Sequence, residues 1–379
     1  MRFSNYLIAS SMVLLSLAGC SPDKEVTVAP SADNTNVFVL NEGVFTANGT
    51  GTITLFNKTT KAVTPDLFQG VNGAGRRLGN VVQSMAVRDK RGYIVVNGAD
   101  KVEVVSLPDF KSVGVVRGLS SPRYFLPIST SRAYVTQWGR DTLHRHGIII
   151  PKVRPGIKIV DLITNVVVDS IATGDLPERL TLAGGKVFVA NSGSNTVTVI
   201  DPITNRVTNT LTVGDAPNSF APDKNNRLWV LCGGFVSYIY VNNIYQGIDY
   251  ASTTAGSLYS LDPANPTTGG TSRVFASNQR VPTDIHANPA GDQLYFRAVD
   301  AGTGQGGVAR LVIADAALPA LTAPFISGLF YGLGIDPTDG TIYTGTGTFS
   351  ADKMTRYQPN GTKIDETVVG AGPNGFVFF

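Results

Sequence analysis

The sequence has few of the side chains that bind metals or form disulfide bonds. It contains three histidines and two cysteines in 379 residues. A structural zinc site takes about four cysteine or histidine ligands, so there is little material for one. We therefore expect no metal centre.

Charge is also scarce. Charged residues make up 16% of the chain, and the formal net charge of +3 is too small to indicate a nucleic-acid partner. Hydrophobic residues make up 42%, enough for a large core. The 41 glycines and 21 prolines follow no Gly-X-Y period, which favours many short strands joined by turns.

One apolar run stands out, at the N-terminus. Arg2 precedes the apolar residues 7–17, a run too short to span a membrane comfortably and typical of a secretory signal peptide. The run ends in Leu-Ala-Gly-Cys, which resembles a bacterial lipobox whose cysteine, Cys20, is lipidated and becomes the mature N-terminus. The alternative is an ordinary signal peptide with an incidental cysteine.

This interpretation divides the chain into three parts. We expect a signal peptide over residues 1–19, a lipidated flexible tether over 20–35 and one globular domain over 36–379. Cys232 is then the only ordinary thiol, so an intrachain disulfide is excluded and the side chain is expected to pack as a small hydrophobe.

A five-residue strand pattern recurs along the domain. The copies are 37–41 (VFVLN), 93–97 (YIVVN), 133–137 (AYVTQ), 187–191 (VFVAN), 228–232 (LWVLC), 294–298 (LYFRA) and 342–346 (IYTGT). Successive copies start 40 to 66 residues apart, and the shortest spacings match the length of a four-stranded propeller blade.

The two ends of the domain complement each other. The N-terminal piece begins with the second strand of a unit, at Val37, and residues 372–379 read as a first strand with nothing after it. Joined, they complete a last blade and leave no open edge. We predict an all-β fold, a seven-bladed β-propeller closed by its N- and C-terminal strands. A sandwich of short strands is the alternative, but it does not explain this complementarity.

The connections after the repeated strand differ in length. They are minimal at 98–100 and 192–194, intermediate at 347–352, and long in four blades, at 42–50, 138–155, 233–256 and 299–307. Because strands run up and down within a blade, these connections and the openings between blades emerge on one face. We predict that this face carries the function.

The long connections are rich in aromatic and polar side chains. Aromatic rings give a large contact area at a small entropic cost. We predict that the ligand contacts from these loops are Phe45, Trp138, Arg140, His144, Phe235, Tyr238, Tyr245 and Phe349. The alternative is that the long loops pack on one another.

A second group of polar residues lies one or two positions from the start of a blade. First strands line the central channel of a propeller, so these side chains are expected to converge there. They are Gln83, Ser84, Arg123, Tyr124, Arg179, Asn218, Asp284 and Asn374, of which Gln83, Arg123, Tyr124, Arg179 and Asn218 are our predicted ligand contacts. The alternative is that they satisfy one another and buried water.

Motifs for catalysis are missing. His144 and His146 alternate as metal ligands can, but Arg145 stands between them and no Cys, Glu or further His is near in sequence, which favours a basic loop rim. No G-x-S-x-G motif, Ser/His/Asp ordering or close carboxylate pair stands out. We predict a binding protein without a cofactor rather than an enzyme.

Residues 187–207, VFVANSGSNTVTVIDPITNRV, resemble the YVTN repeat of YncE-like propellers. The stretches 38–43, 79–85, 93–97 and 121–124 resemble a group of Bacteroidetes outer-membrane lipoproteins of that class. The resemblance covers essentially all of the domain.

The best understood members of that group capture cobalamin at the cell surface and pass it to a TonB-dependent transporter. The resemblance therefore implies an outer-membrane, lipid-anchored and surface-exposed protein that binds a bulky nutrient on its loop-bearing face. The insertions 138–155 and 233–256 depart from the family pattern. A glycan- or protein-binding surface module is the second hypothesis. A lactonase-like enzyme with a channel metal is the third, with Glu178 and Asp284 as acidic candidates.

Overall fold

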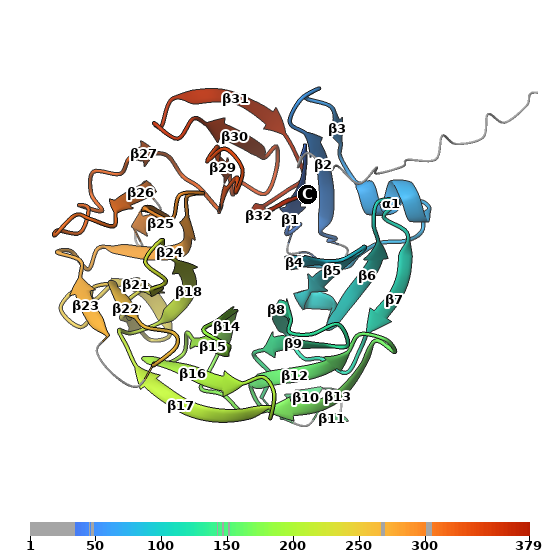
Figure 1. The fold of residues 1–379 in the computed structure, drawn as a ribbon, viewed down its shortest axis with the longest axis horizontal. Coiled ribbons are helices and arrows are strands. Elements are labelled where there is room, and N and C mark those ends of the chain that lie inside the picture. The colour runs from blue at the N-terminus through green and yellow to red at the C-terminus, as the bar shows by residue number, and fades with distance from the viewer. Residues whose placement is uncertain are drawn as a thin grey trace, which may run out of the picture.

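The computed structural model describes residues 35–379, apart from 45, 47–48, 142, 146–147, 151, 267–269 and 301–304. Within this part, seven four-stranded antiparallel sheets stand around a central opening (Figure 1). The predicted seven-bladed β-propeller is confirmed.

Six blades consist of strands that follow one another along the chain, from the channel outward. They are β4 (Val82–Arg88), β5 (Arg91–Val96), β6 (Lys101–Ser106) and β7 (Ser112–Val116); β8 (Pro122–Pro127), β9 (Arg132–Gln137), β12 (Gly156–Asp161) and β13 (Val166–Ile171); β14 (Pro177–Ala183), β15 (Lys186–Asn191), β16 (Thr196–Asp201) and β17 (Arg206–Thr212); β18 (Pro217–Pro222), β19 (Leu228–Cys232), β22 (Ser257–Leu261) and β23 (Thr271–Val274); β24 (Arg280–Ala287), β25 (Gln293–Asp300), β26 (Gly306–Val312) and β27 (Ile326–Ser327); β28 (Gly332–Ile335), β29 (Ile342–Gly345), β30 (Lys353–Tyr357) and β31 (Lys363–Val368).

The remaining blade joins the two ends of the domain, as the sequence predicts. Its strands are, from the channel outward, β32 (Pro373–Phe378), β1 (Asn36–Asn41), β2 (Thr52–Asn57) and β3 (Val63–Thr64). The C-terminal β32 pairs antiparallel with β1. The outer strand is only two residues long and leads into a short helix, α1 (Leu67–Asn72), which the sequence pattern did not reveal.

The repeated second strands are apolar on both faces because each blade packs between two others. β1 and β19 are buried along their whole length. Phe188 of β15 and Val230 of β19 belong to one core cluster, which lies between their blades. A strand buried on both sides reads as a continuous hydrophobic run, and this is why the copies stand out in the sequence.

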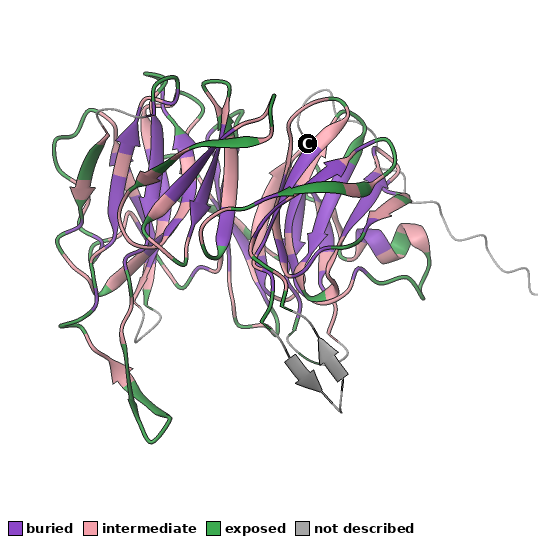
Figure 2. Cartoon of the chain, turned by 90° about the horizontal axis from the view of Figure 1, so that it is seen from below, coloured by how far each residue is buried: buried purple, intermediate pink, exposed green. Residues whose placement is uncertain are grey.

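Two extra hairpins are inserted between the second and third strands of their blades. They are β10 (Leu143–Arg145) with β11 (Ile148–Ile150), and β20 (Tyr238–Val241) with β21 (Ile244–Ile248). Because both occupy the same kind of connection, both leave the disc on the same face, which we call the loop face. Figure 2 shows β20 and β21 extending well beyond the disc at the lower left.

A buried ion pair joins the closing blade to the blade before it. Lys58 follows β2, and its Nζ lies 2.6 Å from Oδ2 of Asp336, which follows β28. The Asp336 side chain is fully buried and that of Lys58 is 15% exposed. Removing one partner of such a pair leaves an uncompensated charge in a poorly solvated place.

We therefore expect Lys58→Met to lower the free energy of unfolding by about 3 kcal/mol, measured by urea denaturation. The matched control is Lys353→Met, because Lys353 forms a solvent-exposed pair with Glu366 that should contribute little. The double variant Lys58→Met/Asp336→Asn should recover part of the loss. Equal effects of Lys58→Met and Lys353→Met would contradict this role of the buried pair.

Candidate functional site

The inner strands share an irregularity near their first residues. In six of the seven, the register with the second strand shifts, so that one or two residues lack a partner. The residues in these bulges are Gln83, Arg123, Tyr124, Glu178, Arg179, Asn218, Asp284, Ile285 and Asn374. A bulge changes the direction in which side chains point. Here it turns polar groups toward the channel.

These side chains line a cavity of about 680 Å³ in the channel. Every residue predicted to converge on the channel lies in its wall, and so does Trp138. Asn97, Ser192 and Gly233 also line it, and each directly follows a second strand. The cavity therefore lies at the end of the channel that opens on the loop face.

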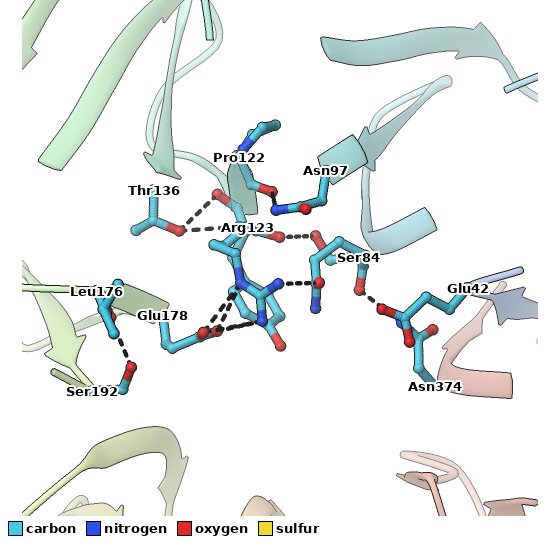
Figure 3. Close-up of polar contacts among 12 residues, drawn as sticks. Glu42, Ser84, Asn97, Pro122, Arg123, Thr136, Leu176, Glu178, Ser192 and Asn374 are labelled. Carbon is cyan, nitrogen blue, oxygen red and sulfur yellow. Dashed lines mark hydrogen bonds and ion pairs between the residues drawn. The ribbon is translucent and has the colours of Figure 1, made fainter. Parts of the chain in front are cut away.

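Arg123 connects three blades on one side of the cavity. Its Nε donates to Glu178 Oε1 at 3.1 Å, and its Nη1 donates to Gln83. The guanidinium lies 3.9 Å from the ring centroid of Trp138. Figure 3 shows Arg123 reaching from its strand toward Glu178, with Ser84 donating to its carbonyl oxygen at 2.7 Å. Burial raises the pKa of the Glu178 carboxyl, and the positive charge of Arg123 opposes that rise.

Asp284 organises the opposite side. It is buried and has a φ of 64°, a left-handed conformation that is unfavourable for a residue with a side chain. Oδ1 accepts from Arg179 and lies 3.1 Å from Nε2 of His286, while Oδ2 lies 3.6 Å from Nε of Arg297. Burial alone would raise the pKa of Asp284, but the charges of these three partners outweigh it and hold the pKa below its ordinary range.

A third polar contact lies between the closing blade and the blade before it. The Tyr331 hydroxyl donates to Oε2 of Glu42, and burial raises the pKa of the Glu42 carboxyl despite this hydrogen bond. The Phe349 ring packs edge-on against Tyr331, with 5.1 Å between ring centroids. The predicted Phe349 thus supports the cavity wall through Tyr331.

The amides of two predicted residues have structural partners. Asn218 Nδ2 donates to the carbonyl oxygen of Pro282 at 3.1 Å, and Asn374 Nδ2 donates to that of Val82 at 3.0 Å. Each bond joins the inner strands of two blades. These two side chains therefore help to fix the ring around the cavity.

Of the predicted loop residues, Trp138 lines the cavity, but those of the β20–β21 insertion do not. Phe235, Tyr238 and Tyr245 belong to the β20–β21 insertion, and they are between 50 and 56% exposed. The rings of Tyr238 and Tyr245 touch edge-on at 6.0 Å. Arg140 is exposed on the rim, with Nη1 3.6 Å from Oδ2 of Asp100. The predicted residues thus form a channel group, which includes Trp138, and a separate group on the loops.

Three sequence predictions fall where the structure gives no description. Cys20 and Phe45 lie outside the described residues, and His144 belongs to β10, of which only the backbone is described. Their predicted roles remain predictions.

Four ionisable residues of the cavity wall were missed as candidates: Glu42, His286, Arg297 and Tyr331. Arg297 is the one charged residue in the otherwise apolar repeat segment 294–298, which is a usable signal. His286 directly follows the bulge that contains Asp284, and the bulge interrupts the simple alternation of side chains that could have predicted their contact. Tyr331 precedes the one inner strand whose start carries no bulge, so the pattern that identified the other blade openings did not apply.

The described residues contain no group of three or more His, Cys, Asp or Glu side chains that could hold a metal ion. Over the same part of the chain, no helix has the length and apolar character needed to cross a membrane. The three cavity carboxylates are instead paired with arginine or tyrosine side chains.

A family model described as a domain of unknown function, DUF5074, matches residues 35–369. The chain belongs to this family. No curated protein is significantly similar to it in sequence.

Several solved structures share the fold of this DUF5074 protein. A quinonprotein alcohol dehydrogenase-like protein from Bacteroides thetaiotaomicron has a TM-score of 0.61 and 13% identity, over 91% of this chain and 78% of that one. A protein from Lactobacillus plantarum has a TM-score of 0.60 and 12% identity, over 91% of this chain and 99% of that one. The periplasmic gluconolactonase of Pseudomonas aeruginosa has a TM-score of 0.59 and 10% identity, over 90% of this chain and 99% of that one. At such identities the likeness shows the fold alone.

The Asp284 cluster gives a prediction on pH. Because the folded-state pKa of Asp284 lies below that of an unfolded Asp, about 3.9, its ionisation stabilises the fold above that pH. The stabilisation is lost as the pH falls toward the folded-state pKa. At pH 7, Asp284→Asn should lower the free energy of unfolding by about 3 kcal/mol, since it leaves arginine side chains unpaired.

Urea denaturation at pH 7, 4 and 3 tests this expectation. The gap between the wild type and Asp284→Asn should narrow as the pH falls. A gap that stays constant over this range would show that the charge of Asp284 is not what stabilises the cluster.

Proposed function

We propose that this DUF5074 protein is a lipid-anchored surface protein that binds a bulky nutrient on its loop face and passes it to a TonB-dependent transporter. Cobalamin is the first candidate ligand, as the family resemblance in the sequence implies. The observation that carries the proposal is a cavity, lined by charged and amide side chains among apolar ones, that opens on the same face as an exposed aromatic hairpin.

The size of the cavity limits how a bulky ligand would bind. About 680 Å³ falls within the range of about 300–1,000 Å³ typical of small-molecule sites. A corrinoid is too large to be enclosed there. It would place one polar part in the cavity and lie across the mouth, where Trp138 and the tyrosines of β20 and β21 offer aromatic surface.

The ion pairs in the cavity favour binding over acid–base catalysis. Glu178 is engaged by the fork of Arg123, and Asp284 is held by Arg179 and His286. Both side chains are committed to these partners, and the partners of Asp284 hold its pKa below its ordinary range, which opposes proton exchange with a substrate. The likeness to the gluconolactonase is one of fold and brings no reaction to this chain.

The exposed tyrosines favour a second candidate, a glycan- or protein-binding surface module. Tyr238, Tyr240 and Tyr245 lie close together on the hairpin, and all are at least half exposed. Tyrosine contributes large contact area with a polar tip, which suits either kind of partner.

The ligand is tested by calorimetric titration of the purified protein with cyanocobalamin. We expect one-to-one binding that weakens more than 10-fold, about 1.4 kcal/mol, in the double variant Trp138→Ala/Tyr245→Ala. The matched control is Ile163→Ala/Ile203→Ala, which truncates two exposed side chains in turns at the opposite end of the blades. No heat with cyanocobalamin at several temperatures would remove this ligand and direct the search to glycans.

The anchor is tested separately. Cys20→Ala should abolish incorporation of labelled fatty acid and release the protein from the outer-membrane fraction, because the lipid would be its only attachment. Cys232→Ala is the control, since that thiol is buried in the propeller. A Cys20→Ala variant that remains in the outer membrane would contradict the proposed anchoring.

A further inference from the structure

Around Asp284, the cavity wall exposes positive groups and buries the negative one. The side chains of Arg179, His286 and Arg297 are 31%, 26% and 19% exposed, whereas that of Asp284 is 6% exposed. A ligand that enters from the loop face would therefore meet N–H donors before it meets the carboxylate.

The two guanidinium groups also have donors to spare. A guanidinium carries five N–H groups. Among the described residues, Arg179 uses Nη2 for Asp284 and Arg297 uses Nη1 for the carbonyl oxygen of Phe330 at 3.1 Å, while Nε of Arg297 has no hydrogen-bond acceptor. Arg123 differs, since Glu178 and Gln83 engage all three of its nitrogens.

The charges in direct contact with Asp284 do not balance, although Glu178 also acts on Arg179 from the neighbouring wall. Two arginines face the single carboxylate of Asp284, and His286 adds a positive charge whenever it is protonated. The arginines are also held in place. Asp284 fixes the end of Arg179, whose guanidinium lies 4.8 Å from the ring centroid of Tyr124. Donors fixed in advance lose little entropy when a ligand binds.

We propose that Arg179, Arg297 and His286 form a subsite for an oxyanion, a carboxylate or phosphate group of the ligand, and that Asp284 positions them. The inference rests on the proposed function, because it names the chemistry of one part of the captured ligand. Arginine forks match the paired oxygens of both groups, and bonds between ionised partners are about twice as strong as neutral ones. A phosphodiester of a corrinoid and a carboxylate of another nutrient would both satisfy the site.

Direct titration of the purified protein tests the subsite. Inorganic phosphate and succinate are titrated at constant ionic strength, and succinamide serves as the uncharged match for succinate. We expect at least one of the two anions to bind, and succinamide to bind at least 10-fold more weakly than succinate wherever succinate binds. Absence of binding by both anions, or equal affinity for succinate and succinamide, would overturn the proposal.

Variants then locate the binding. Arg179→Met and Arg297→Met should each weaken anion binding at least 10-fold. The control is Arg273→Met, because Arg273 also lies over an aromatic ring, that of Trp229, but on an outer strand away from the cavity. Circular dichroism checks the fold. If a methionine variant unfolds, Arg179→Lys replaces it in the titration. This variant keeps the charge and loses the fork, so we expect it to bind the anion with intermediate affinity. Unchanged affinity in all these cavity variants would overturn the proposal.

A competition experiment separates this subsite from the proposed function. If phosphate lowers the apparent affinity for cyanocobalamin, the phosphodiester of cobalamin occupies the subsite. If phosphate binds through Arg179 and cyanocobalamin does not bind at all, the subsite holds and cobalamin is excluded as its ligand. If cyanocobalamin binds and neither anion does, the subsite is wrong and the proposed function stands.

Discussion

The pairing of β1 with β32 is the constraint on which the rest of the molecule depends. The backbone N–H of Asn36 donates to the carbonyl oxygen of Phe379 at 3.0 Å, and the N–H of Phe379 donates back at 2.9 Å. A single four-stranded blade cannot bury both of its faces, so each blade needs a neighbour on either side. Only a closed ring supplies this for all of them, and the closure is achieved by main-chain hydrogen bonds between residues at the two ends of the domain.

The cavity is a consequence of how each blade begins. In five blades the residue before the inner strand has a left-handed conformation: Val81, Ser121, Leu176, Ala216 and Gly372. This sharp entry is followed directly by the bulge that turns one or two side chains toward the axis. The same backbone device repeated around the ring places polar groups from separate blades within reach of one another. The inner strands thus supply much of the cavity wall, and the long connections add Glu42, Trp138 and Gly233 to it.

The sequence predicts the fold better than the site, for a physical reason. Each second strand is buried on both faces, so burial dictates its residue types, and the repeat is visible without a structure. The bulges are almost as easy to locate in the sequence, because several inner strands begin with proline and polar residues follow it. The channel group could therefore be predicted as a group.

The partners within the cavity could not be predicted. Arg179 and Asp284 are 105 residues apart, and their contact depends on the curvature of the ring and on the bulges that aim them. Arg297 contacts Asp284 from a second strand, and at positions of that strand the sequence repeat predicts side chains that pack in the core. The split between the channel group and the hairpin tyrosines depends on the length and direction of β20 and β21. No local sequence rule fixes either.

Stability alone does not account for the Asp284 cluster. A buried ion pair costs much of its attraction in lost hydration, and well-packed apolar side chains of similar volume often replace such pairs without loss. Here the chain also holds Asp284 in a left-handed conformation that costs about 1–3 kcal/mol. Compared with well-packed apolar side chains at the same positions, the ring therefore gains little stability from this arrangement. The cluster does, however, keep two guanidinium groups fixed at the mouth of a channel, and that is what recognition of an oxyanion requires.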